Sequence, residues 1–320
     1  MYSVNQNAAK IVKEQIIPHA EEMGCKVHVL ESGATVVDMG VFAPGGWRAG
    51  KLFVEATIGG LGHVQFGRFQ LGEIDLPSID VYIDHPMEST LVTQFSGWPM
   101  LGADAETGIK PIGSGPARAI AKFDPFALAF DYTDYCHEAV FGAQCTTLPG
   151  EDTVADIVEK TKCRPENIYI LAASSGTLTG CIQVCSRTVE ASGGRLWKKG
   201  FPLNKIISGM GSCPVPPCTR SELAGIDRVN TALLYGGSVR WLVDCTDAEI
   251  EALIDELPFS ASRRYGEEFI DLFEEGKRDF YIVDKDIHTI AYYEINNIAT
   301  GHTFKAGVLR EDLLKKCFDR

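Results

Sequence analysis

The chain has 320 residues, of which 45% are hydrophobic and 23% charged, a composition typical of a globular protein with a sizeable core. Its formal net charge of −13, without any basic stripe, argues against nucleic acid or an anionic membrane as a partner. No signal-peptide pattern opens the sequence and no apolar run is long enough to cross a bilayer, so we expect a cytoplasmic protein.

The first half of the sequence predicts a mixture of helices and strands. Apolar spacing indicates an amphipathic helix over residues 5–23, interrupted near Pro18. Strands at 27–30 and 35–40 flank a turn and therefore predict a hairpin. The other elements predicted in this half are a short element at 49–56, strands at 64–69 and 81–84, and helices at 87–98, from 116 onward and at 151–162.

The second half begins with an apolar run at 168–173, which predicts a buried strand. From Thr179 to Glu190 apolar residues recur at helical spacing and predict a helix. Glycine and proline are frequent in residues 206–217, a composition that predicts a loop without regular structure. The remaining predicted elements are strands at 238–243, 280–283 and 290–298, helices at 247–257 and 266–275, a hairpin turn at 300–301 and a terminal helix.

These elements follow one another without a sustained βαβ rhythm, and neighbouring strands are often joined by short turns. This pattern favours an α+β fold with mixed or antiparallel sheets over a doubly wound parallel sheet. No internal repeat or low-complexity linker marks a domain break, so composition sets no boundary within residues 1–320.

Arg187 and Glu190 are three residues apart on a predicted helix, so they lie on one face of it. A guanidinium beside a carboxylate lowers the pKa of the carboxylate, whereas apolar walls raise it. Such a tunable acid is suited to general-base chemistry. The alternative is a solvated surface pair of small energetic value, and the spacing taken alone favours that alternative.

Glycine-rich stretches at 59–62, 113–116, 209–214 and 236–237 are candidate ligand loops, because glycine lets the backbone approach a ligand closely. The stretch at 113–116 enters a predicted helix and could offer N–H groups to an anion. Taken alone, each stretch is more often a tight turn.

Metal and disulfide chemistry have no clear sequence signal. No set of His, Cys, Asp and Glu shows the spacing of metal ligands. The ten cysteines are scattered and contain no Cys-x-x-Cys pair, so we expect reduced, mostly buried thiols.

Short motifs along nearly the whole chain together resemble the methenyltetrahydromethanopterin cyclohydrolase family. They occur in the family's order, and their combination is more specific than any one of them. The motifs are Ser3-Val4-Asn5-x-Asn7-Ala8, Gly59-Gly60-Leu61, Gly113-Ser114-Gly115-Pro116-Ala117-Arg118-Ala119, Pro165-Glu166-Asn167, Arg187-x-x-Glu190, Tyr235-Gly236-Gly237, Asp279-Phe280-Tyr281 and Thr300-Gly301.

The resemblance implies a subunit of two α/β domains with a deep pocket between them, assembled as a homotrimer. It implies reversible hydrolysis of N5,N10-methenyltetrahydromethanopterin to the N5-formyl form, a step of one-carbon metabolism in methanogenesis or its reverse. No metal or other cofactor is implied, because tetrahydromethanopterin is itself the carrier of the substrate. In this interpretation Glu190 positions and deprotonates a water molecule, and Arg187 tunes Glu190.

The resemblance also implies which residues bind the pterin substrate. They are Gly113, Ser114, Gly115, Pro116, Phe95, Asn230, Tyr235 and Gly236. Ala173-Ser174-Ser175 stands where the family usually has Ala-Pro-Thr, and Arg228-Val229-Asn230-Thr231 stands where it usually has Arg-Thr-Asn-Asp. These departures bear on pterin contacts and carrier preference rather than on the reaction. Two alternatives stay open: another pterin or folate one-carbon enzyme on the same scaffold, and a non-catalytic pterin-binding protein.

Overall fold

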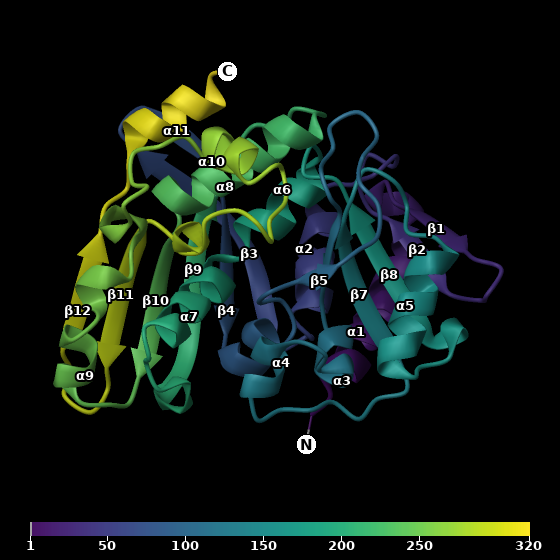
Figure 1. The fold of residues 1–320 in the computed structure, drawn as a ribbon, viewed down its shortest axis with the longest axis horizontal. Coiled ribbons are helices and arrows are strands. Elements are labelled where there is room, and N and C mark those ends of the chain that lie inside the picture. Colours follow the sequence, from purple (N-terminus) through teal and green to yellow (C-terminus); the bar gives the residue numbers. More distant parts are fainter. Residues whose placement is uncertain (1) are drawn as a thin grey trace. The chain divides into compact units, whose positions relative to one another are not determined.

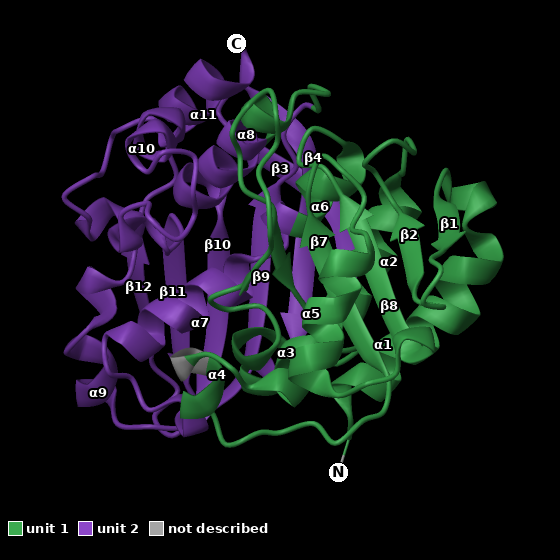
Figure 2. Cartoon of the chain, turned by 45° about the vertical axis from the view of Figure 1, so that its right-hand side comes forward, with its two compact units in different colours: residues 1–63, 87–183, 218–225 green, residues 64–86, 184–217, 226–320 purple. Residues whose placement is uncertain are grey.

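The computed structural model describes residues 2–320, without the side chains of residues 125 and 126. The chain forms two units, each assembled from separate segments of the sequence (Figures 1 and 2). Unit 1 contains Met1–His63, Met87–Gln183 and Cys218–Gly225, and unit 2 contains Val64–Pro86, Val184–Pro217 and Ile226–Arg320. Each unit has a six-stranded sheet of mixed strand directions accompanied by helices, which confirms the predicted α+β class.

The sheet of unit 1 has the strand order β1-β2-β8-β7-β6-β5. Its strands are β1 (Lys26–Val29), β2 (Thr35–Asp38), β8 (Ile168–Ala173), β7 (Ala139–Gln144), β6 (Ile112–Ser114) and β5 (Trp98–Pro99). β2, β8 and β7 run parallel, whereas β1, β6 and β5 pair antiparallel with their neighbours. The β1–β2 pair confirms the hairpin predicted from the sequence.

Both faces of this sheet are covered, which explains why β8 is an uninterrupted apolar run. Alternate residues of β8, such as Tyr169 and Leu171, pack in one core cluster with α1 (Val4–Ile11) and α2 (Trp47–Thr57). The intervening residues, such as Ile170, pack in a second cluster with α5 (Glu151–Thr161). The other helices that begin in this unit are α3 (Ala117–Ala121), α4 (Pro125–Ala129), α6 (Leu178–Cys185) and α8 (Glu222–Gly236).

The sheet of unit 2 has the order β12-β11-β10-β9-β4-β3. Its strands are β12 (Thr303–Gly307), β11 (Tyr292–Asn297), β10 (Ser238–Val243), β9 (Ile206–Pro214), β4 (Ile74–Ile83) and β3 (Gly62–Leu71). β10 and β11 pair in parallel, whereas β12–β11, β10–β9 and β9–β4 are antiparallel. The remaining helices are α7 (Thr188–Lys198), α9 (Asp247–Glu251), α10 (Phe269–Glu275) and α11 (Glu311–Phe318).

The loop predicted for residues 206–217 is wrong, because most of this segment is the inner strand β9. Its glycines allow close packing instead of turns. A Cβ added to Gly209 would lie 2.6 Å from the ring of Trp241, and one added to Gly211 would lie 1.9 Å from Thr188 Oγ1. Both distances are far below van der Waals contact, so only glycine fits at these two positions.

Four other predicted elements differ from the structure. The helix predicted over 247–257 is α-helical only to Glu251 and is followed by a 3-10 turn over Ile254–Glu256. The helix predicted over 5–23 is α-helical only to Ile11, and π-helical and 3-10 turns continue it to Met23. Residues 87–98 contain a π-helical turn over Met87–Val92 instead of a full helix. Residues 280–283 are turns and not a strand. Lys277 and Arg278 adopt left-handed φ values of 55° and 56° just before them, which turns the chain.

Across residues 2–320, every helix is too short or too polar to cross a lipid bilayer.

Candidate functional site

The segment that carries Arg187 and Glu190 is two helices and not the single predicted one. α6 ends at Cys185, and α7 begins at Thr188. Arg187 is the N-cap residue of α7, with φ −79° and ψ 16°, and its carbonyl accepts a hydrogen bond of 2.8 Å from the Ala191 N–H. The break places Glu190 in the first turn of a new helix.

Arg187 and Glu190 form an ion pair in which Nη1 and Oε2 are 3.8 Å apart. Their side chains are 22% and 13% exposed, so the pair is not a fully solvated surface pair. The N-terminus of a helix carries a partial positive charge, which stabilises a carboxylate in the first turn. Two local features, the guanidinium and the helix terminus, therefore favour the ionised form of Glu190.

A second cation, Lys198, interacts with the same carboxylate from the far end of α7. Burial lowers the pKa of the Lys198 ammonium, and the attraction of Glu190 opposes that effect. The charge of Glu190 thus interacts with cationic groups at both ends of its helix.

Close packing on β9 holds the first turn of α7 in place. Gly211 faces this turn, and the Cβ of any larger residue would also lie 3.2 Å from Val189 Cγ2, in addition to its clash with Thr188. Thr188 and Val189 are both buried. The position of Glu190 therefore depends on the absence of a side chain at residue 211.

We expect Gly211→Ala to lower the free energy of unfolding by about 1–3 kcal/mol, the usual cost of overpacking a tight core. Displacement of α7 should also reduce kcat. Chemical denaturation and steady-state kinetics measure the two effects. Because Thr188 Oγ1 is the nearest clashing atom, adding Thr188→Ala should restore part of the stability. Unchanged stability in the single variant would show that α7 is not held in this way.

The predicted loop at 113–116 is a loop only in part, because Gly113 and Ser114 end strand β6 and only Gly115 and Pro116 join it to α3. The segment is tightly packed within unit 1. A Cβ on Gly113 would lie 1.9 Å from the Phe141 ring, and Gly115 has a left-handed φ of 107°. The Gly115 N–H donates to the Thr93 carbonyl (2.7 Å), and the Pro116 carbonyl accepts from Asn5 Nδ2 (2.8 Å). Ser114 is buried. The Gly115–Thr93 bond brings this loop against the segment that contains the buried Phe95.

The other predicted binding residues lie along α8. Asn230 is half-buried and donates from Nδ2 to the Ile226 carbonyl one turn earlier (2.8 Å). The Tyr235 hydroxyl donates to the Glu267 carbonyl (2.6 Å) and accepts from the Gly266 N–H (3.1 Å), while burial raises its pKa to about 12. Gly236 packs against Pro214, and an added Cβ would lie 2.8 Å from that ring. Each of these residues has a clear packing role, and their contact with substrate stays a prediction.

A buried polar cluster that the sequence did not single out lies in unit 1. Glu222 accepts hydrogen bonds from Ser174 Oγ and the Ser175 N–H, both at 2.6 Å, and Gln144 Nε2 lies 3.4 Å from its other oxygen. Three segments distant in the sequence meet here. The sequence contained one indication of this cluster. Ser174 and Ser175 are two hydroxyl residues directly after a buried strand, at a place where the family usually has Pro-Thr.

Among residues 2–320, no group of three or more His, Cys, Asp and Glu side chains is arranged to hold a metal ion. The described part of the chain includes all ten cysteines and contains no disulfide, and the thiols of Cys181 and Cys218 lie 3.8 Å apart.

Comparison with known proteins gives one consistent result. A family model described as "Cyclohydrolase (MCH)" matches residues 3–318. The methenyltetrahydromethanopterin cyclohydrolase of Methanothermobacter marburgensis is 36% identical over 325 residues, which cover 99% of each chain. The protein of the same name from Methanocaldococcus jannaschii is 34% identical over 99% of this chain and 98% of its own. The one from Methylobacillus flagellatus is 31% identical over 99% of this chain and 95% of its own.

Proposed function

This chain belongs to the methenyltetrahydromethanopterin cyclohydrolase family, and we propose that Glu190 and Arg187 are the catalytic pair of its reaction. The activity is that of the family: hydrolysis of a cyclic C–N bond of methenyltetrahydromethanopterin in one-carbon metabolism. The observation that supports the pair is its geometry, a mostly buried carboxylate at a helix N-terminus with a guanidinium 3.8 Å away.

The reaction needs a base more than an electrophilic catalyst. The methenyl carbon lies between two ring nitrogens of a cationic amidinium and is electrophilic already. Glu190 accepts one proton as a water oxygen bonds to this carbon, which gives a tetrahedral intermediate. Glu190 then returns the proton to N10 as the C–N10 bond breaks. The hydroxyl becomes the formyl carbonyl on N5, and its proton leaves to solvent, so the cation and water give the neutral formyl product and one proton.

Arg187 acts through Glu190 in this proposal. Its guanidinium keeps the carboxylate ionised and oriented toward the water. A carboxylate near a cationic substrate also stabilises the ground state, and equal stabilisation of both states does not raise kcat. The catalytic gain therefore comes from alignment of the water and the base at the tetrahedral stage.

The family resemblance supports the rest of the proposal. The protein acts in the cytoplasm as a homotrimer on a tetrahydromethanopterin substrate, without a metal or organic cofactor and without a nucleic-acid or membrane partner. The loop at 113–116, Phe95, Asn230, Tyr235 and Gly236 contribute to substrate binding.

A decrease in methenyl absorbance when purified protein is added to methenyltetrahydromethanopterin tests the activity directly. The Glu190→Gln protein prepared in parallel controls for spontaneous hydrolysis and for contaminating enzymes. Faster turnover of the corresponding folate substrate would favour the related one-carbon enzyme. Binding of the pterin without turnover would favour the non-catalytic alternative.

Treatment with EDTA or 1,10-phenanthroline should change neither kcat nor the melting temperature. The substrate cation is already electrophilic, so the mechanism has no step that needs a Lewis acid. Metal analysis of the purified protein, before and after chelation, accompanies the kinetic measurement. Stoichiometric zinc or iron, with loss of activity on its removal and recovery on its return, would contradict the proposal.

A further inference from the structure

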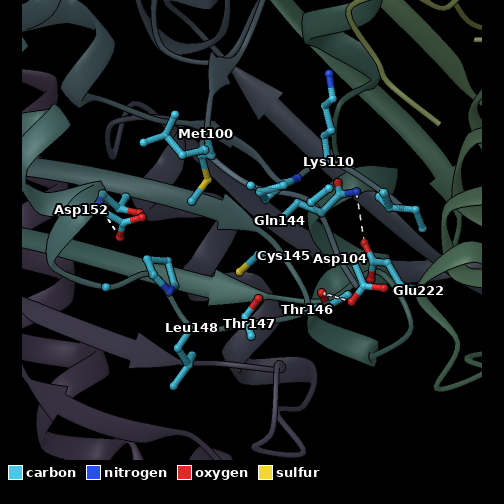
Figure 3. Close-up of a pocket in the computed structure, with 18 residues that line it drawn as sticks. Met100, Asp104, Lys110, Gln144, Cys145, Thr146, Thr147, Leu148, Asp152 and Glu222 are labelled. Carbon is cyan, nitrogen blue, oxygen red and sulfur yellow. Dashed lines mark hydrogen bonds between the residues drawn. The ribbon is translucent and has the colours of Figure 1, made fainter. Parts of the chain in front are cut away.

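Unit 1 contains a cavity of about 150 Å³ beyond the carboxyl end of β7 (Figure 3). Gln144 is the last residue of β7, and the segment that follows it, Cys145 to Gly150, forms one wall. β7 and β8 run parallel, so Ser174 and Ser175 follow β8 at the same edge of the sheet. In open sheets with parallel strands, ligands bind outside the carboxyl ends of the strands.

Glu222 is the most enclosed charged group in the wall of this cavity, with 7% of its surface exposed. Oε2 accepts two hydrogen bonds of 2.6 Å, from Ser174 and Ser175, whereas the only donor to Oε1 among the described residues is the Gln144 amide at 3.4 Å. Burial raises the pKa of Glu222, and the existing hydrogen bonds only oppose this effect. Oε1 therefore retains capacity to accept one further N–H bond, which would stabilise the buried charge.

The side-chain amide of Gln144, next to Glu222, can donate a hydrogen bond to a ligand. Gln144 accepts from Gln183 Nε2 at 3.3 Å and directs one of its two amide hydrogens to Glu222 (Figure 3). Its second amide hydrogen remains to be donated. The wall thus presents a donor and an acceptor next to each other.

Other charged groups make the cavity negative. Asp104 accepts from Thr107 and Thr146, and these bonds lower its pKa to about 2, so it is ionised at neutral pH. Asp152 also lines the cavity, and Lys110 is the one cation among its described lining residues. A ligand rich in N–H donors fits this arrangement better than an anion does.

The size of the cavity restricts what can enter. A cavity of this volume holds about one six-membered ring, whereas drug-sized ligands need roughly 300–1,000 Å³. The pyrimidinone ring of a pterin is one such ring. Its edge presents a carbonyl oxygen, a ring N–H and an amino group in sequence, which is an acceptor followed by two donors.

The geometry points to a subsite for this pterin edge, in which Glu222 Oε1 accepts from the 2-amino group, and Gln144 donates to the ring carbonyl. The inference rests on the proposed function, which supplies a pterin as substrate. It assigns Glu222 and Gln144 to substrate recognition, separately from the bond-breaking step.

Glu222→Gln tests the subsite, because the amide keeps the shape and removes the charge. We expect KM to rise by about 10- to 100-fold, the loss typical of one hydrogen bond to a charged group, with kcat within about threefold. Glu151→Gln is the matched control, since Glu151 is also the first residue of a helix but is exposed and does not line the cavity. KM should be unchanged in that control.

A pair of ring probes separates recognition from general loss of structure. 6-Methylpterin carries the 2-amino group, whereas 6-methyllumazine has a carbonyl at that position, which would face the Glu222 carboxylate. Calorimetric titration should show that wild type prefers the pterin by about 10-fold or more, and that Glu222→Gln loses the preference. If Glu222→Gln does not fold, Gln144→Leu, which removes the donor to the ring carbonyl, should weaken binding of both probes.

Binding of these probes requires no turnover, so the result does not depend on whether Glu190 is the base. An unchanged preference for the pterin in a folded Glu222→Gln protein would overturn the subsite. Equal binding of both probes by wild type would overturn it as well.

Discussion

Glu190→Gln is expected to lower kcat by about 100- to 10,000-fold, the range that a positioned general base contributes. Glutamine preserves the shape of the side chain but cannot accept the proton of the attacking water. Substrate affinity, measured by titration in the absence of turnover, should stay within about threefold of wild type if binding and proton transfer are separate. The loss should therefore appear in kcat and not in the dissociation constant.

Glu249→Gln is the matched control for this variant. Glu249 is likewise the third residue of a helix in unit 2, where it accepts from Thr246 and pairs with Lys205. Its replacement tests the structural cost of removing a first-turn glutamate and should leave kcat unchanged. Comparable activity in Glu190→Gln and wild type would remove Glu190 from the mechanism.

Arg187→Ala is expected to reduce kcat at neutral pH by about 100-fold, the scale of loss that follows misplacement of a catalytic group. It should also change the pH dependence. The base works only when ionised, so activity falls as the pH drops through its pKa. Removal of a nearby cation raises that pKa, and the acid limb of the rate profile should move to higher pH. Arg187→Lys keeps the positive charge but loses the planar guanidinium group. Its pH–rate profile should therefore lie between those of wild type and Arg187→Ala.

Arg240→Ala provides the comparison for Arg187. Arg240 is an exposed arginine of unit 2 that pairs with Glu294 at 3.5 Å, and its loss should leave both kcat and the pH profile unchanged. A profile that stays the same in both Arg187 variants, with weaker substrate binding alone, would show that Arg187 holds the substrate and does not act on Glu190.

The elements that the sequence predicted well are those whose local pattern and tertiary environment agree. β8 and β10 have the predicted bounds, because an apolar run between turn residues permits few other structures. For α9 only the predicted start at Asp247 is confirmed. This start is a local feature, because Thr246 and Glu249 form a capping box within four adjacent residues. The β1–β2 hairpin is equally local, since one short turn joins its strands.

Tertiary contacts decided the elements that the sequence did not predict. β9 contains two glycines and one proline, residues typical of a loop, yet Trp241 and Thr188 approach it so closely that glycine is required at 209 and 211. The break between α6 and α7 was hidden because apolar spacing continues across Ser186 and Arg187. Only the backbone shows that Arg187 caps a new helix.

The residues of the candidate site also fall into two groups, those related by a local sequence motif and those brought together only by the fold. Arg187 and Glu190 were identifiable because both belong to one short motif on one helical turn. Glu222, Ser174 and Gln144 come from three segments that the sheet of unit 1 and its connections bring together, so no spacing in the sequence relates them. A buried glutamate at the start of a helix has no sequence signature that distinguishes it from an exposed one.

The order of segments along the chain also determines how the protein is synthesised. β3 and β4 are made early, but the strand that pairs with β4 is β9, and residues 87–183 of unit 1 are translated in between. An isolated two-stranded hairpin is at best marginally stable, and an unpaired strand edge promotes association with other chains. The sheet of unit 1 has all six of its strands once Ala173 is made, whereas unit 2 must wait for Gly307. The nascent chain therefore has an unpaired edge on β4 while residues 87–183 of unit 1 are synthesised. This is the stage at which chaperones would protect that edge.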